Sequence, residues 1–173
     1  MLALKPVEFV VSRLPDTDKA KAKAIMKYPL GHVRERVLKE GELSETIVDV
    51  AIEEYRKFMV LLALGNRNLA MCSKEVDEIW HNHILFTRDY AQFCQSIFGS
   101  FVHHMPATSA QPVSQASVDR FYSAYETIFG QVSPIWNAQY FPCLLKGACG
   151  GIPQGCGDCG GTCVSEEQKK ADK

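Results

Sequence analysis

The sequence predicts an all-α protein, a compact multi-helix domain of about five helices with an irregular Gly/Cys-rich C-terminal tail. Apolar residues recur at helical spacing in several segments, and no segment alternates apolar and polar residues as a strand would. The chain has 173 residues and is 46% hydrophobic, enough for one substantial core and too short for two full domains. We therefore expect a helical domain at 1–146 and a tail at 147–173.

Two short helices are expected first. One of the polar residues at 16–18 is predicted to cap a helix over 19–28, which stops near Pro29. A second helix over 32–40 is predicted to end at Gly41. Both are too short to be stable without packing against the rest of the domain.

A longer helix is predicted from Ser44 to Gly65. Its apolar face is expected to consist of Ile47, Val50, Ala51, Tyr55, Phe58, Met59 and Leu62. Its polar face is expected to carry Glu53, Glu54, Arg56 and Lys57.

Two more helices complete the predicted body. Ser73 is a suitable N-cap for a helix that runs to about Gly99. A final amphipathic helix is predicted from near Ser117 to Gly130, after a polar loop at about 105–116.

Charge and length exclude several classes of partner. The formal net charge is -1 and no Lys/Arg-rich block occurs, which argues against nucleic-acid binding and against a polybasic membrane anchor. The N-terminus does not resemble a secretory signal, and the apolar run at 60–71 is too short to span a bilayer. We expect a cytoplasmic protein, in which the seven cysteines suit metal or redox chemistry better than disulfides.

Four of the five histidines fall in one aromatic-rich stretch. They are His81, His83, His103 and His104, and Asp77 lies one helical turn before the first of them. Imidazole and carboxylate groups are the ligands expected of zinc or non-haem iron. The stretch therefore predicts a site for Zn or Fe, whose identity depends on geometry that the sequence does not define.

Helical geometry separates the two histidines of the expected helix. His81 and His83 point roughly 200° apart because each residue advances the helix by about 100°. In one arrangement, Asp77 accepts a hydrogen bond from His81 or joins it as a ligand, and a histidine from the loop after the helix completes the site. In the other, the helix breaks around Asn82 and both imidazoles reach one ion.

These side chains also have ordinary structural interpretations. A buried His83 could hydrogen-bond a backbone carbonyl, and His103 with His104 could cap the helix end. Cys94 is expected to be a small buried core residue. His32 has no partner that the sequence identifies.

The tail offers a second set of metal ligands. From Gly147 onward it is too rich in glycine and too poor in apolar residues to form a core. Metal ligation through Cys149, Cys156, Cys159 and Cys163 is one interpretation, because Cys156 and Cys159 have C-x2-C spacing. A disordered extension is the other, and a dithiol redox pair lacks its usual βαβ context.

The histidine motif resembles that of the glycine-rich domain-containing protein-like family of bacteria and plants. The D-x-x-W-H-x-H element of that family matches Asp77, Trp80, His81 and His83, and the likeness extends over residues 43–106. The supporting runs are residues 54–58, 76–83, 87–90, 93–94, 98–99 and 103–106. The resemblance implies a helical domain and no defined activity.

Three functions remain open from the sequence. The leading one is a metal-binding helical protein with a His-cluster site that serves sensing, storage, delivery or structural support. The first alternative is a metal-dependent enzyme with an open coordination position. The second alternative is a metal-independent protein–protein interaction module with a flexible Cys/Gly tail, and the sequence does not define its partner or the oligomeric state.

Overall fold

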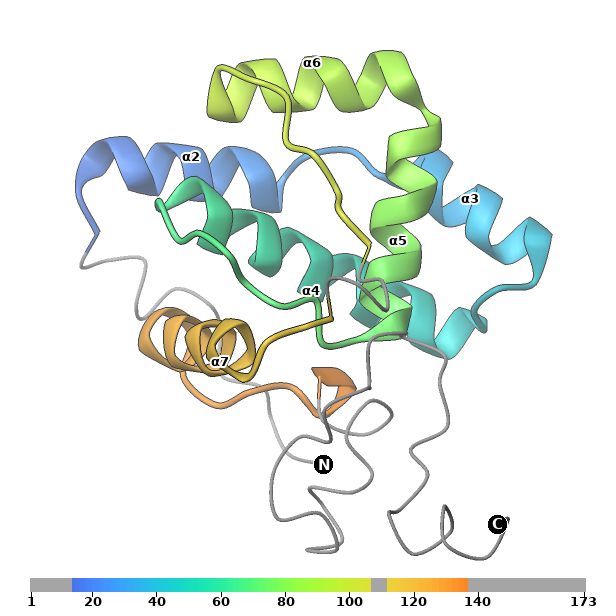
Figure 1. Ribbon diagram of the computed structural model, residues 1–173. Coiled ribbons are helices and arrows are strands. Elements are labelled where there is room, and N and C mark those ends of the chain that lie inside the picture. The colour runs from blue at the N-terminus through green and yellow to red at the C-terminus, as the bar shows by residue number, and fades with distance from the viewer. Residues whose placement is uncertain (1–13, 107–111, 137–173) are drawn as a thin grey trace, which may run out of the picture.

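The protein is an assembly of α-helices (Figure 1). The structure, a computed structural model, describes residues 14–106 and 112–136. Within these ranges the chain forms no strand, and its elements are α2 (Asp16–Met26), α3 (Gly31–Glu40), α4 (Glu45–Ala63), α5 (Lys74–Leu85), α6 (Thr87–Phe98), α7 (Gln115–Phe129) and the short 3-10 helix η1 (Pro134–Trp136). The all-α prediction is confirmed here, and the tail at 147–173, with its predicted boundary, lies outside the described residues.

Several helix ends follow the expected capping chemistry. Gly41 ends α3 with φ 71°, in the left-handed region that favours glycine. Ser73 caps α5, since its Oγ accepts the N–H of Val76. The start of α2 differs from the prediction: Pro15 precedes the helix without a side-chain cap, and Asp16 is already the first helical residue.

α4 occupies the centre of the fold and contacts α2, α3, α5 and α7. Its buried apolar stripe includes Val48, Ala51, Tyr55, Phe58 and Met59. The predicted assignment of Ile47 and Val50 to this stripe was wrong, because their exposed fractions are 39% and 44%. Both residues lie in the first two turns of α4, whereas Leu61, on the same side further along the helix, is buried.

The predicted polar face of α4 was also partly wrong, because Glu54 and Lys57 are buried. Glu54 Oε1 accepts a hydrogen bond from Lys57 Nζ at 2.8 Å. Glu54 Oε2 accepts from Tyr125 Oη at 2.7 Å and from Trp136 Nε1 at 2.6 Å. These four residues, here the Glu54 cluster, join α4 to α7 and η1.

The helix expected from Ser73 to Gly99 is interrupted at Phe86. This residue has φ -82° and ψ 64°, so α5 ends at Leu85 and α6 begins at Thr87 in a new direction (Figure 1). On a continuous helix Trp80 and Tyr90 would lie about 15 Å apart along the axis. In the folded chain Trp80 Nε1 donates a hydrogen bond to Tyr90 Oη at 2.9 Å. No glycine or proline marks the break.

After α6, residues 99–106, here the return segment, run from the end of α6 back to α5 (Figure 1). Tyr90 Oη donates a hydrogen bond to the carbonyl oxygen of Val102 at 2.6 Å. The break at Phe86 and this return therefore bring three parts of the histidine-rich stretch together. None of the helices in the described ranges combines the length and apolarity required to cross a membrane.

Candidate metal centres

Helix α5 contributes to two separate groups of metal-ligand side chains. The inner group consists of His32, His83 and Asp89, and the outer group consists of Asp77, His81 and His104. In each group the candidate ligand atoms lie within 4.8 Å of one another. The two histidines of the H-N-H sequence thus belong to different groups.

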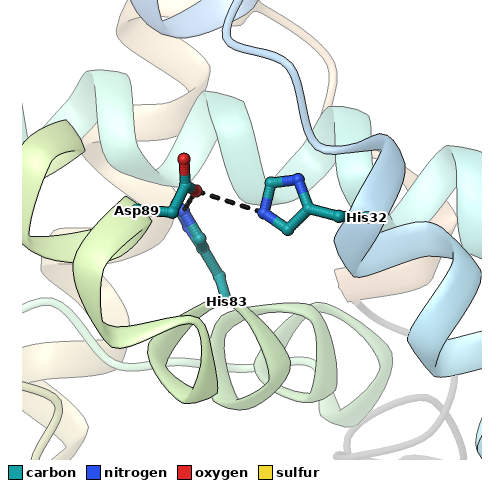
Figure 2. A group of neighbouring side chains, drawn as sticks. All are labelled: His32, His83 and Asp89. Atoms are coloured by element: carbon teal, nitrogen blue, oxygen red, sulfur yellow. Dashed lines mark hydrogen bonds and ion pairs between the residues drawn. The ribbon is translucent and has the colours of Figure 1, made fainter.

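The inner group joins α3, α5 and α6. Asp89 Oδ2 lies 3.0 Å from His83 Nε2 and 3.1 Å from His32 Nε2. Figure 2 shows both imidazole rings directed at this carboxylate. The break at Phe86 makes the arrangement feasible, because it turns the first residues of α6 back toward His83.

Two tyrosine hydroxyl groups form hydrogen bonds with side chains of the inner group. Tyr55 Oη lies 2.8 Å from His83 Nδ1, and Tyr28 Oη donates to Asp89 Oδ1 at 2.8 Å. Burial raises the pKa of both tyrosines, which keeps their hydroxyls protonated. Hydrogen bonds of this kind orient metal ligands in known metalloproteins.

His83 is fully buried, with a side-chain exposed fraction of 0%. Burial lowers its pKa to about 4, although Asp89 acts in the opposite direction. The imidazole is therefore neutral at pH 7. A neutral imidazole has a lone pair on one ring nitrogen, which is the form that binds a metal.

His32 lies at the open side of the inner group. Its side chain is 34% exposed and that of Asp89 is 33% exposed. The Nε2 atom of His32 is itself buried and has no hydrogen-bond partner of acceptable geometry in the described part of the chain, despite its 3.1 Å distance to Asp89. The Phe86 ring packs edge to face against the His32 ring, with the ring centroids 4.5 Å apart, and this contact restricts the orientation of His32.

The outer group joins α5 to the return segment. Asp77 Oδ1 lies 2.7 Å from His104 Nε2, and Asp77 Oδ2 lies 3.6 Å from His81 Nε2. The two imidazole centroids are 4.6 Å apart. His103 is in neither group, and its ring contacts Phe101 at 4.9 Å.

The structure distinguishes between the two arrangements predicted for the histidines. Asp77 and His81 lie one turn apart on a continuous helix, and His104 reaches them from the return segment. The alternative with a break around Asn82 was wrong, because α5 continues to Leu85. The predicted tail ligands Cys149, Cys156, Cys159 and Cys163 lie outside the described residues.

Other expectations are corrected or confirmed. The polar partners of His83 are the side chains of Tyr55 and Asp89 rather than a backbone carbonyl. Cys94 is buried, as predicted, and so is Cys72.

His32 and Asp89 were not identified from the sequence. On a continuous helix Asp89 would point about 120° away from His83 and lie about 9 Å along the axis, and the break at Phe86 brings them together. His32 comes from another helix, 51 positions earlier in the chain. A lone histidine next to Gly31 carries no spacing signal.

The geometry of the inner group suits a transition metal. Metal–ligand bonds of about 2.0–2.2 Å in a tetrahedral arrangement place neighbouring ligand atoms about 3.3–3.6 Å apart. The two distances to Asp89 Oδ2, 3.0 and 3.1 Å, are slightly shorter than that spacing, so a small outward shift would admit an ion. Two imidazoles and one carboxylate occur in zinc sites and in non-haem iron sites.

No curated protein and no solved structure shows a significant match to the chain. The profile of the UCP032817-like family matches residues 20–126. This range covers more than half of the chain and contains every residue of the inner and outer groups. The chain belongs to the UCP032817-like family.

Proposed function

We propose that this protein binds one divalent transition metal ion, zinc or iron, at the inner group. The observation that carries the proposal is the approach of two imidazole Nε2 atoms to one carboxylate oxygen, at 3.0 and 3.1 Å. His32, His83 and Asp89 would be the protein ligands.

The surrounding side chains support these roles. With His83 Nε2 bound to an ion, its Nδ1 carries the hydrogen and donates it to Tyr55 Oη, 2.8 Å away. Tyr28 fixes the other oxygen of Asp89. Burial lowers the pKa of His83 to about 4, so its imidazole is already neutral at pH 7 and need not lose a positive charge before it binds a metal.

A metal-dependent enzyme is the second candidate, favoured by the open side of the inner group. Structural zinc sites have four protein ligands, whereas catalytic sites have three and keep a position for water or substrate. The inner group offers three ligands, and two of them are about one-third exposed.

Elemental mass spectrometry of the untagged full chain tests metal binding. The background carries serine at the four tail cysteines, which removes thiolate ligands, and His81→Ala, which removes a ligand of the outer group; one equivalent of metal should remain. Adding His32→Ala or Asp89→Asn should abolish it, whereas adding the control His103→Ala, outside both groups, should not. Metal that persists in both inner-group variants would contradict the proposal.

Cobalt substitution defines the ligand set. Co²⁺ at two imidazoles and a carboxylate should give visible d–d bands without the near-ultraviolet band of a cobalt–thiolate bond. Displacement of a bound water by azide should shift these bands if a coordination position is open. A spectrum that azide leaves unchanged favours a closed site over an enzyme.

A further inference from the structure

A second site is indicated on the solvent side of α5. Asp77 and His81 are one helical turn apart, and His104 reaches them from the return segment. These residues form no part of the inner group, so the inference goes beyond the proposed function and does not depend on it.

The outer group uses both oxygens of one carboxylate. Asp77 Oδ1 faces His104 Nε2 at 2.7 Å, while Asp77 Oδ2 faces His81 Nε2 at 3.6 Å. The spacing brackets the separation of about 3.3–3.6 Å between neighbouring ligands of a tetrahedral ion. The i,i+4 spacing on α5 places His81 beside Asp77, and the return segment adds His104, so two imidazoles face one carboxylate.

Burial differs among the three side chains. Asp77 and His104 are 12% and 10% exposed, whereas His81 is 43% exposed. The His104 ring packs edge to face against Trp80, with the ring centroids 4.5 Å apart, and this contact fixes the His104 imidazole in place. His81 can adjust its side chain at little cost, because almost half of it faces solvent. Two ligands are therefore fixed, and the third can close on an ion.

An ion at this position would fasten the return segment. In the structure the segment is held by Tyr90 Oη, which donates to the Val102 carbonyl, and by the bond from His104 to Asp77. Metal coordination would replace the second of these with bonds from three side chains to one ion.

We infer that Asp77, His81 and His104 form a second site for a divalent transition metal ion, which pins residues 99–106 to α5 when it is bound. Exposure of His81 makes this site exchangeable with ions in solution. The expected class of ligand is an imidazole-preferring ion such as Zn²⁺.

Isothermal titration with Zn²⁺ tests this site in the full chain. The background carries His32→Ala, which removes an inner ligand, and serine at the four tail cysteines. This background should bind one equivalent of Zn²⁺. His81→Ala and His104→Ala should each lose it, while His103→Ala, the adjacent and matched substitution, should retain it.

Hydrogen–deuterium exchange provides the second readout. Zn²⁺ should slow exchange of the amides at residues 101–105 in the background and in His103→Ala, with no slowing in His81→Ala. His81 is exposed, so loss of binding in that variant does not arise from unfolding.

Three results would overturn the inference: no Zn²⁺ binding in the background, binding that survives either His81→Ala or His104→Ala, or binding without protection of the return segment. A failure of the proposed function would give a different result. His32→Ala would then leave the metal content of the otherwise native chain unchanged, while His81→Ala would still remove one equivalent.

Discussion

Two polar clusters in this helical body have opposite characters. In the Glu54 cluster one carboxylate accepts hydrogen bonds from Lys57, Tyr125 and Trp136, at 2.6 to 2.8 Å. In the inner group one carboxylate oxygen faces two imidazole nitrogens, and His32 Nε2 has no well-aligned hydrogen-bond partner among the described residues.

The difference lies in what surrounds each carboxylate. Glu54 is surrounded by N–H and O–H groups that can only donate to it, and the charge of Lys57 balances its own. Asp89 faces His83, whose ring is neutral and can offer a lone pair, and His32 at an open edge. The first cluster is complete as a structural element, whereas the second has the donor atoms that a cation requires.

Glu54→Ala should have the largest effect on stability. It leaves the ammonium group of Lys57 buried without its main partner and removes the acceptor for Tyr125 and Trp136, so unfolding should become easier by about 3–5 kcal/mol. Urea denaturation measures this change. Glu53→Ala, at the half-exposed neighbour that also pairs with Lys57, is the matched control and should change stability by less than about 1 kcal/mol. Equal effects of the two substitutions would contradict the structural role assigned to the Glu54 cluster.

The inner group should make stability depend on pH. The pKa of His83 is lowered from 6.5 to about 4 in the folded protein, so the unfolded chain binds more protons between these values. The free energy of unfolding should therefore fall as pH decreases from about 6.5 to about 4, by about 3 kcal/mol. Urea titrations with a chelator present should show this slope in the native sequence and lose it in His83→Gln. An unchanged slope in that variant would mean that His83 is not buried in its neutral form.

The sequence predicted the helices well where local chemistry defines their ends. Ser73 and Gly41 mark the start of α5 and the end of α3, as the capping rules require. Phe86 carries no such signal, since the apolar spacing continues through it. The break there is stabilised by tertiary contacts, such as the bond from Trp80 to Tyr90, which sequence patterns do not contain.

The same distinction applies to the two candidate centres. The outer group was predictable in part, because Asp77 and His81 are one turn apart and His104 follows in the same stretch. The inner group depends on the break and on packing of α3 against α5, so Asp89 and His32 could not be found from spacing. Glu54 was missed for another reason: it interrupts the apolar stripe of α4, and a charged residue was taken to face solvent.

Tyr55→Phe should have an intermediate effect on stability and a clear effect on metal affinity. The substitution leaves His83 Nδ1 buried without its partner, which should lower the free energy of unfolding by about 2 kcal/mol. Loss of an orienting hydrogen bond should weaken metal binding about 10- to 100-fold. Competition with a chelating dye measures the affinity. Tyr122→Phe, which removes a bond to the Trp136 carbonyl, should leave the affinity unchanged, and a loss there would indicate a general effect of unfolding.

His32→Ala should have the smallest effect on the metal-free protein and distinguishes the two clusters most directly. The side chain is one-third exposed and its Nε2 makes no well-aligned hydrogen bond in the described structure, so the substitution should change stability by at most about 1 kcal/mol. When His81→Ala is present in both proteins to remove the outer group, however, metal at 100 times its dissociation constant should stabilise the protein with His32 by about 2.7 kcal/mol and the His32→Ala variant by almost nothing. Thermal unfolding with and without Zn²⁺ measures both terms. Because Glu54→Ala should retain the metal-dependent gain while losing basal stability, the two variants should show opposite patterns; a gain that His32→Ala preserves would place the ion elsewhere in the chain.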